Sequence, residues 1–279
     1  MNENNFEISV VIPLYNAAAK IKLAIASVNE QADGGLKYIK EIIVINDGSQ
    51  DDSYRSVQML IGESKVPIHL LNQSNSGVSV ARNRGMNVAQ GNWIAFLDAD
   101  DVWEPDKIAV QVKQLMEHDQ IDLLGSYYND QPVRVLFRRI VGLYQVSVLD
   151  MLLKSFPSTP TVLMKKQIFE EIGGFDVTQR YAEDTNYFLK IASSYNVFFL
   201  AHRMVTLNMD KEVFGESGLS SKLFEMHRGT LKNLMAAFER HDIGALTYLF
   251  LRGFYQLKFI RRIIISKQKS WTNRKERSI

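Results

Sequence analysis

The segment NWIAFLDADDVW, residues 92–103, holds the strongest fold signal in the sequence. Its bulky apolar residues are typical of a buried strand, and carboxylates follow them at once at Asp98, Asp100 and Asp101. In an extended segment, residues i and i+2 face the same side, so Asp98 and Asp100 can reach one ligand together. A buried strand that ends in several carboxylates predicts a functional site at that end of the sheet.

The first hundred residues alternate between short β-rich runs and helical stretches, which is typical of a parallel sheet wound with helices. We expect strands at residues 8–13, 41–46, 68–71 and 93–98, with helices at 18–30, 51–62 and 78–90. In open sheets of this kind, ligands bind at the carboxyl ends of the strands. The polar residues that follow three of these strands should therefore converge on one crevice.

Beyond residue 103 the pattern becomes mixed. A helix is expected at 104–119, because Pro105 suits a first helical turn. Two antiparallel strands are expected at 121–130 and 133–140. Helices should follow from residue 165, at 183–193, and from residue 224 to the end.

The composition limits the kinds of functional site that the chain can hold. The chain has 279 residues, of which 46% are apolar, so it can bury a large core. It has no cysteine, which excludes disulfides, thiolate metal sites and a cysteine nucleophile. The N-terminal sequence MNENNFEISVVIPLYN lacks a basic n-region and a separate apolar stretch, so no secretory signal is indicated and a cytoplasmic location is expected.

The aspartates after the fourth strand select the ligand. Carboxylates repel a bare phosphate, so the ligand is either cationic or bound through a divalent metal. Mg²⁺ and Mn²⁺ take one or two carboxylates together with substrate phosphate oxygens. The alternative is an acidic loop that only caps the next helix. Neither GxGxxG nor GxxxxGK[ST] occurs, so a dinucleotide fold and a P-loop have no support.

The helix expected at 78–90 carries small residues at every fourth position: Gly77, Ala81, Gly85 and Ala89. Such a face permits close packing on the sheet. Asn75 or Ser76 can cap this helix, and its N-terminal N–H groups favour an anionic ligand. Arg82 and Asn83, one turn in, could reach the same ligand. A purely structural helix explains the small residues equally well.

Four segments resemble the family 2 glycosyltransferases of the GT-A fold: SVVIPLYN (9–16), EIIVINDGSQDDS (41–53), NSGVSVARNRGMNVAQGNWIAFLDADD (75–101) and GGFDVTQRYAEDTNYFLKIA (173–192). They occur in the family's order and reach to about residue 200. The resemblance implies an α/β GT-A fold, a Rossmann-like, mostly parallel sheet with helices on both faces, plus a C-terminal helical extension. It further implies a nucleotide-sugar-binding half at 1–103, an acceptor-binding and catalytic-base half at 104–222, and a basic helical extension at 223–279.

The resemblance also implies roles for the residues at the strand ends. Pro13, Tyr15 and Asp47 should border a uridine-like base, and Arg82 should line the nucleotide. Asp98 and Asp100 should serve ribose and metal, with Asp100 the more direct ligand of Mn²⁺ or Mg²⁺. The full set expected to bind the nucleotide sugar is Pro13, Tyr15, Asn16, Asp47, Gly48, Asn75, Gly77, Arg82, Asp98 and Ala99.

Asp184 corresponds to the family's general base, which removes a proton from the acceptor hydroxyl as the new bond forms. The alternative is an acidic first helical turn favoured by the helix dipole. The acceptor side should include Thr159, Gly174, Phe175 and Glu183. Family members often supply a histidine after the base helix, and the stretch MDKEVFGESGLSSK has none, so metal ligands beyond the aspartates stay unassigned.

The C-terminal region combines apolar and basic residues. Four basic residues within 243–265 argue against a membrane-spanning helix, since charge at the bilayer centre is costly. From Lys258 onward eight basic residues accompany one acid, Glu276, which favours a helix on an anionic membrane surface. A helix packed on the protein is the alternative. No recognition motif supports nucleic acid. We expect peripheral contact with the inner face of the cell membrane through residues 243–279.

These features predict a metal-dependent inverting glycosyltransferase, of the hexosyl or N-acetylhexosaminyl type. It would move a sugar from a UDP-sugar to a glycan or lipid-linked acceptor in bacterial surface polysaccharide synthesis. The alternative is a non-catalytic nucleotide-sugar-binding scaffold of the same fold. A nucleotidyltransferase would need a glycine-rich basic loop after the first strand, which PLYNAAAK lacks.

Overall fold

The computed structural model describes residues 6–130, 132–207 and 222–276, with side chains as far as residue 266. The chain divides into two compact units. Unit 1 comprises Met1–Thr178 and Asp184–Asp210, and unit 2 comprises Gln179–Glu183 and Lys211–Ile279. The functional boundaries expected after residues 103 and 222 stay predictions.

Within its described residues, unit 1 is built on one nine-stranded sheet of order β3-β2-β1-β4-β10-β6-β11-β5, with β9 beside β11. The strands are β1 (Ile8–Leu14), β2 (Ile39–Asp47), β3 (Ile68–Gln73), β4 (Trp93–Phe96), β5 (Val102–Trp103), β6 (Leu123–Tyr128), β9 (Leu143–Gln145), β10 (Leu163–Lys165) and β11 (Val197–Thr206). The first four strands are parallel, and β10 runs antiparallel between β4 and β6. The parallel sheet expected for the first hundred residues is confirmed.

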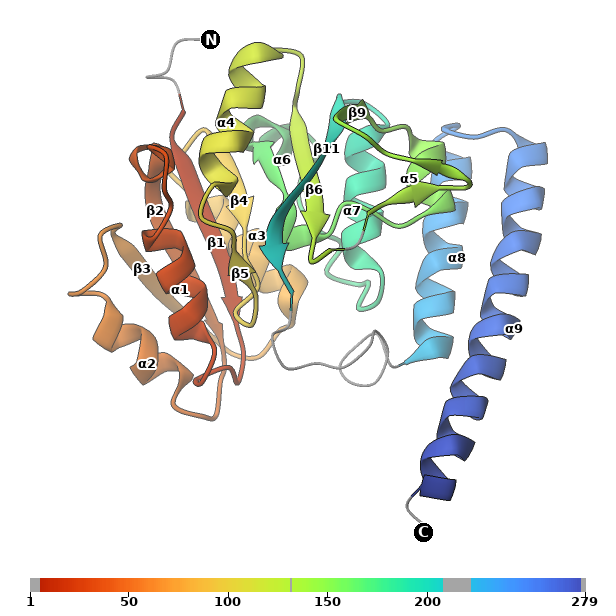
Figure 1. Ribbon diagram of the computed structural model, residues 1–279, viewed down its shortest axis with the longest axis horizontal. Coiled ribbons are helices and arrows are strands. Elements are labelled where there is room, and N and C mark those ends of the chain that lie inside the picture. The colour runs from red at the N-terminus through yellow and green to blue at the C-terminus, as the bar shows by residue number, and fades with distance from the viewer. Residues whose placement is uncertain (1–5, 131, 208–221, 277–279) are drawn as a thin grey trace. The chain divides into compact units, whose positions relative to one another are not determined.

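Helices cover both faces of the sheet, as expected. Figure 1 shows α1 and α4 in front of the sheet and α3 and α6 behind it. The helices of unit 1 are α1 (Ile21–Asn29), α2 (Ser53–Leu60), α3 (Val78–Val88), α4 (Lys107–Glu117), α5 (Val148–Leu153), α6 (Lys166–Ile172) and α7 (Glu183–Ala192), with short 3-10 turns at η2 (Gly35–Tyr38) and η3 (Thr159–Thr161).

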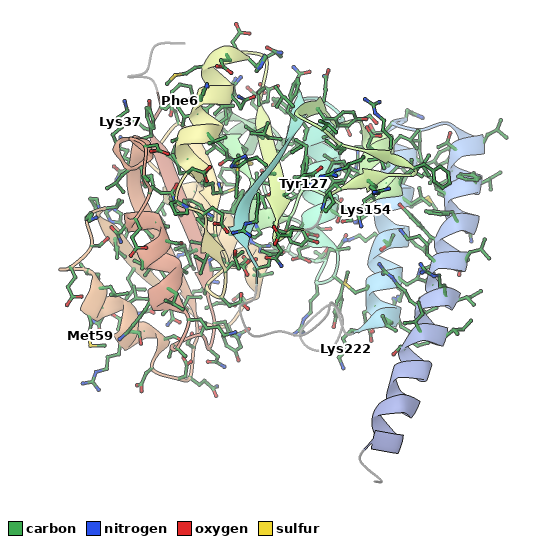
Figure 2. All side chains as sticks on the ribbon, viewed as in Figure 1. Phe6, Lys37, Met59, Tyr127, Lys154 and Lys222 are labelled. Carbon is green, nitrogen blue, oxygen red and sulfur yellow. The ribbon has the colours of Figure 1, made fainter. Side chains whose placement is uncertain are left out.

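The small-residue face of α3 packs on β1 and β2. Ala81 and Gly85 are buried, and a Cβ atom at Gly85 would overlap the side chain of Val11. The close packing expected from the four-residue spacing is therefore confirmed for these two positions. The apolar core extends to the start of β1, where Phe6, labelled in Figure 2, lies against the rings of Tyr38 and Trp93.

The pairing expected between 121–130 and 133–140 is wrong. Strand β6 instead pairs in parallel with β11 and antiparallel with β10. Both partners lie later in the chain, the ten-residue β11 on one side and the three-residue β10 on the other. Residues 133–140 fold back on themselves as a small hairpin of β7 (Arg134–Val135) and β8 (Arg138–Arg139).

Unit 2 contains α8 (Leu223–Glu239) and α9 (Ala245–Glu276), which pack on each other. The helical C-terminal region is confirmed, with a break after α8 at which His241 adopts a positive φ. The segment Gln179–Glu183 is held by α8, because Asn233 donates to the carbonyl of Ala182 at 2.9 Å. Over the ranges that the structure describes, none of the helices is long and apolar enough to cross a bilayer.

Candidate active site

The carboxyl ends of β1, β2 and β4 meet at one edge of the sheet. Leu14 of β1 lies opposite Asn46 of β2, and β1 also pairs in parallel with β4. The N–H of Leu97 donates to the carbonyl of Val11 at 3.1 Å, so Asp98 follows one residue beyond this contact. The structure thus brings the expected polar residues after these three strands to the same edge.

The Asp47 carboxylate is buried and holds the loop before α3. It accepts hydrogen bonds from Gln73 Nε2 at 2.7 Å and from the backbone N–H groups of Ser76 and Gly77 at 2.8 Å each. The cap expected from Asn75 or Ser76 is wrong: the N-cap residue of α3 is Gly77 and it carries no side-chain cap. Asp47 of β2 instead holds the backbone at Ser76 and Gly77, immediately before the first turn of the helix. Since a carboxylate accepts about four hydrogen bonds, Asp47 keeps capacity for a ligand.

Two loops approach closely beside Asp47. Gly48 has a φ of +70°, and a Cβ atom there would lie 2.8 Å from the backbone nitrogen of Asn75. Gly77 also has a positive φ, at +91°. Asn16 fixes the neighbouring loop, since its Oδ1 accepts from the N–H of Gln50 at 2.8 Å. In the neighbouring loop Tyr15 is half-exposed and Pro13 is partly buried.

Arg82 pairs with Asp98 beneath the strand ends. The guanidinium Nη2 lies 2.7 Å from Asp98 Oδ1, and the two side chains are 5% and 29% exposed. The Arg82 guanidinium carbon also lies 5.3 Å from the centre of the Phe175 ring. The sequence placed both residues at the site but gave no signal that they pair. Asp98 is therefore partly neutralised by the chain itself.

The aspartate loop offers hard oxygen ligands. The N–H of Asp101 donates to the carbonyl of Asp98 at 3.1 Å, which closes a turn around Ala99 and the partly buried Asp100. No group of three or more His, Cys, Asp or Glu side chains able to hold a metal occurs in the described part of the chain. This donor set still fits Mg²⁺ or Mn²⁺, because such ions take one or two carboxylates and complete their shell with phosphate oxygens and water.

A side-chain clamp joins α3 to the loop before α7. Asn83 Oδ1 accepts from the N–H of Phe175 and its Nδ2 donates to the Phe175 carbonyl, both at 2.8 Å. A Cβ atom at Gly174 would overlap Asn83, so this close approach requires glycine there. Phe175 is itself buried, at 3% exposed. Asn83 was expected to reach an anionic ligand, but its contact with Phe175 was not predicted, because nothing in the sequence pairs it with a residue 92 positions later.

Buried rings connect the strand ends to the first turn of α7. The Phe175 ring lies 4.4 Å from the ring of Tyr187, one turn after Asp184. The contacts Asp98–Arg82–Phe175–Tyr187 therefore run from the end of β4 to the helix that carries Asp184. Asp184 is partly buried, and its Oδ1 accepts from the N–H of Thr185 at 2.6 Å. Glu183 beside it is buried. The positive end of the helix dipole favours a carboxylate at this position.

Buried polar side chains hold the loop that contains Thr159. Trp103 Nε1 donates to the carbonyl of Pro160 at 3.1 Å, and Gln111 Nε2 donates to that of Thr161 at 3.0 Å. Lys107 Nζ in turn donates to Gln111 Oε1 at 2.6 Å and lies 4.3 Å from the Trp103 ring centre. Thr159 is itself 3% exposed, and Pro160 and Thr161 are buried too, so none of the three faces solvent.

Lys107 is fully buried, and burial lowers its pKa from 10.5 to about 7. Between these two values the unfolded chain binds more protons than the folded chain, so the free energy of unfolding should rise with pH. We expect Lys107→Met to flatten this rise. Urea unfolding at about pH 7 and about pH 10 measures the difference. The exposed Lys113 of the same helix supplies the control, Lys113→Met, which should keep the slope. An unchanged slope in Lys107→Met would contradict the assignment.

Comparison with known proteins gives one family. The model described as Glycosyl transferase family 2 matches residues 9–181. The glycosyltransferase YibD of Escherichia coli is 41% identical over 119 residues, which is 43% of this chain and 33% of YibD. A glycosyltransferase of Rickettsia conorii is 33% identical over 196 residues, which is 70% of this chain and 31% of the relative. The chain spans about a third of the length of these two relatives.

Solved structures share the fold. TarS of S. aureus in complex with UDP-GlcNAc has a TM-score of 0.65 at 17% identity, covering 82% of this chain and 67% of that chain. The mannosyltransferase PcManGT of Pyrobaculum calidifontis, in complex with GDP-Man and Mn²⁺, has a TM-score of 0.65 at 16% identity, covering 91% of this chain and 70% of that chain. At these identities the likeness shows the fold alone.

Proposed function

This chain belongs to glycosyl transferase family 2, and we propose that it is a metal-dependent, inverting glycosyltransferase that uses a UDP-sugar. The observation that carries the proposal is the convergence of Asp47, the Arg82–Asp98 pair and Asp100 at one edge of the parallel sheet. TarS and PcManGT bind UDP-GlcNAc and GDP-Man, so the fold accepts nucleotide sugars. The choice of UDP rests on the sequence resemblance around Tyr15 and Asp47.

In the proposed donor site, the Tyr15 ring borders the base and the Asp47 carboxylate holds both the loop and the base edge. Asn16, Gly48, Asn75, Gly77 and Ala99 shape the backbone around the nucleotide, and Pro13 lies beside the base. Asp98 contacts the ribose while Arg82 fixes its orientation. Asp100, with Asp98 beside it, is the ligand for Mn²⁺ or Mg²⁺. When bound, such an ion disperses the charge of the departing diphosphate.

In the proposed reaction, the oxygen of the acceptor hydroxyl forms a bond to the anomeric carbon, and Asp184 accepts the proton of that hydroxyl. The bond between that carbon and the diphosphate breaks in the same displacement, so the configuration inverts. Asp184 lies in the first turn of α7, where the helix dipole favours a carboxylate. We expect the acceptor to lie along Thr159, Gly174, Phe175 and Glu183, of which Gly174 is partly exposed and the other three are buried.

The proposed acceptor is a glycan or a lipid-linked sugar of a bacterial surface polysaccharide, reached from the inner face of the cell membrane. Peripheral membrane contact through residues 243–279 fits this role. Large apolar side chains of α9 are exposed at Leu246, Leu249, Phe250, Leu257, Ile260 and Ile264. Their spacing places them on one face of the helix. The basic residues from Lys258 onward add attraction to anionic lipid.

A panel of UDP-, GDP- and TDP-sugars with Mn²⁺ tests the proposed function. We expect slow release of UDP from one UDP-sugar, because a transferase without acceptor leaks some sugar to water. Added EDTA should abolish the release. The alternative, a non-catalytic scaffold of the same fold, predicts binding of the nucleotide sugar without release. Release from a GDP-sugar alone would contradict the choice of UDP.

A further inference from the structure

The hairpin of β7 and β8 exposes large apolar side chains at its tip. Leu136 is 62% exposed and Phe137 is 96% exposed, and Val141 just beyond β8 is 77% exposed. Their position sets them apart from scattered surface residues, because Leu136 and Phe137 are adjacent and form the whole turn between the two strands. The proposed transfer reaction assigns no role to them.

Leu136 and Phe137 are unfavourable residues for the turn that they form. Leu136 has a φ of +53° at the first of the two turn residues. Hairpin turns with a positive φ at this position favour glycine, and a bulky residue there is an outlier. Phe137 then adds an aromatic ring that packs on almost nothing. A sequence that served only to connect β7 and β8 would carry small polar residues, so the apolar tip indicates a binding role.

Three arginines surround this tip, at Arg134, Arg138 and Arg139. Arg134 lies directly opposite Arg139 across the two strands, an arrangement in which like charges repel. Arg138 lies over the ring of Tyr144, with its guanidinium carbon 5.3 Å from the ring centre. Within the described ranges, none of these arginines forms an ion pair with a carboxylate. Their charge is available to an anionic partner.

The base of the hairpin is firmly held, although its tip is exposed. The Tyr127 hydroxyl of β6, labelled in Figure 2, donates to the carbonyl of Ile140 at 2.6 Å. The N–H of Ile140 donates to the carbonyl of Val133 at 3.1 Å, and both side chains are buried. The two ends of the hairpin are therefore anchored in unit 1, and the turn is presented as a fixed projection.

We propose that the β7–β8 hairpin inserts Leu136 and Phe137 into the surface of an anionic lipid bilayer, with its three arginines on the lipid phosphates. Apolar side chains flanked by basic ones are the composition of interfacial membrane contacts, and guanidinium groups bind phosphate in a bidentate manner. A glycan would instead need amides or carboxylates near the ring, which the hairpin lacks. The contact belongs to unit 1 and is separate from residues 243–279, and it does not depend on glycosyl transfer.

A tryptophan at the tip reports this contact. Phe137→Trp is placed in a Trp271→Phe background, where the remaining Trp93 and Trp103 are buried. We expect its fluorescence to shift to the blue and to be quenched by brominated lipid on vesicles of phosphatidylglycerol and phosphatidylcholine, but not on phosphatidylcholine alone. If the protein binds the anionic vesicles while this tryptophan stays in water, the proposal is overturned, and α9 is then the membrane contact.

Vesicle sedimentation measures the contribution of each part. Arg134→Gln, Arg138→Gln and Arg139→Gln should each lower partitioning about five-fold, which corresponds to ~1 kcal/mol per basic residue. The double variant Leu136→Gly, Phe137→Asn carries residues that favour this turn, so it should fold. A loss of its partitioning onto vesicles therefore reports the apolar tip. Arg55→Gln, an exposed arginine of α2, is the matched control. Leu257→Ser with Ile260→Ser tests α9 separately. Unchanged partitioning in the hairpin variants would contradict the proposal.

Discussion

Asp184→Asn is expected to lower turnover about a hundred- to ten-thousand-fold, the usual contribution of a positioned general base. Asparagine keeps the size and the acceptor oxygen that receives the N–H of Thr185 at 2.6 Å, so α7 should start in the same way. It cannot take a proton. Initial rates with saturating donor measure the loss, and calorimetry of UDP binding should give nearly the wild-type affinity.

Two further variants separate the base from a helix-capping role. Asp184→Glu keeps a carboxylate but moves it by one methylene, so it should recover part of the lost turnover. Glu117→Gln, a surface carboxylate of α4, should leave turnover unchanged. Near-normal turnover in Asp184→Asn would remove Asp184 from the reaction, and the carboxylate would then serve only the helix dipole.

Asp100→Asn is expected to lower kcat/KM about a hundred-fold or more. A divalent ion contributes several kcal/mol to charge stabilisation, and each 1.4 kcal/mol is about tenfold in rate. The partly buried Asp100 lies in the turn closed by Asp98 and Asp101. Titration of activity with Mn²⁺ should show a higher half-saturating concentration in the variant. An unchanged Mn²⁺ dependence would show that Asp100 is not a ligand.

Asp98→Asn is expected to lower stability as well as activity, because Asp98 pairs with the buried Arg82 at 2.7 Å. Removing one partner of a buried ion pair costs about 3 kcal/mol or more. Urea unfolding of the wild-type protein and of this variant measures the loss. An unchanged free energy of unfolding would contradict a stabilising role for the pair.

Local sequence patterns were sufficient for the parallel half of the sheet. Each of the first four strands is a short apolar run followed by polar residues, and helices separate consecutive strands, so the type of each strand follows from its own residues. The hairpin at 133–140 and the partners of β6 were predicted wrongly. Strand pairing in a mixed sheet depends on which later segment is long and apolar enough to cover β6, and residues 123–128 do not encode that choice.

The sequence by itself determined the family, the strand-end position of Asp47 and Asp98, and the carboxylates available for a metal, because these follow from motifs within short segments. Only the tertiary structure decided how these groups are used. Asp47 accepts from the N–H groups just before α3, Arg82 pairs with Asp98, and Asn83 holds the backbone of Phe175. Each of these contacts joins residues on different elements, and such distances are set by the packing of the sheet and its helices.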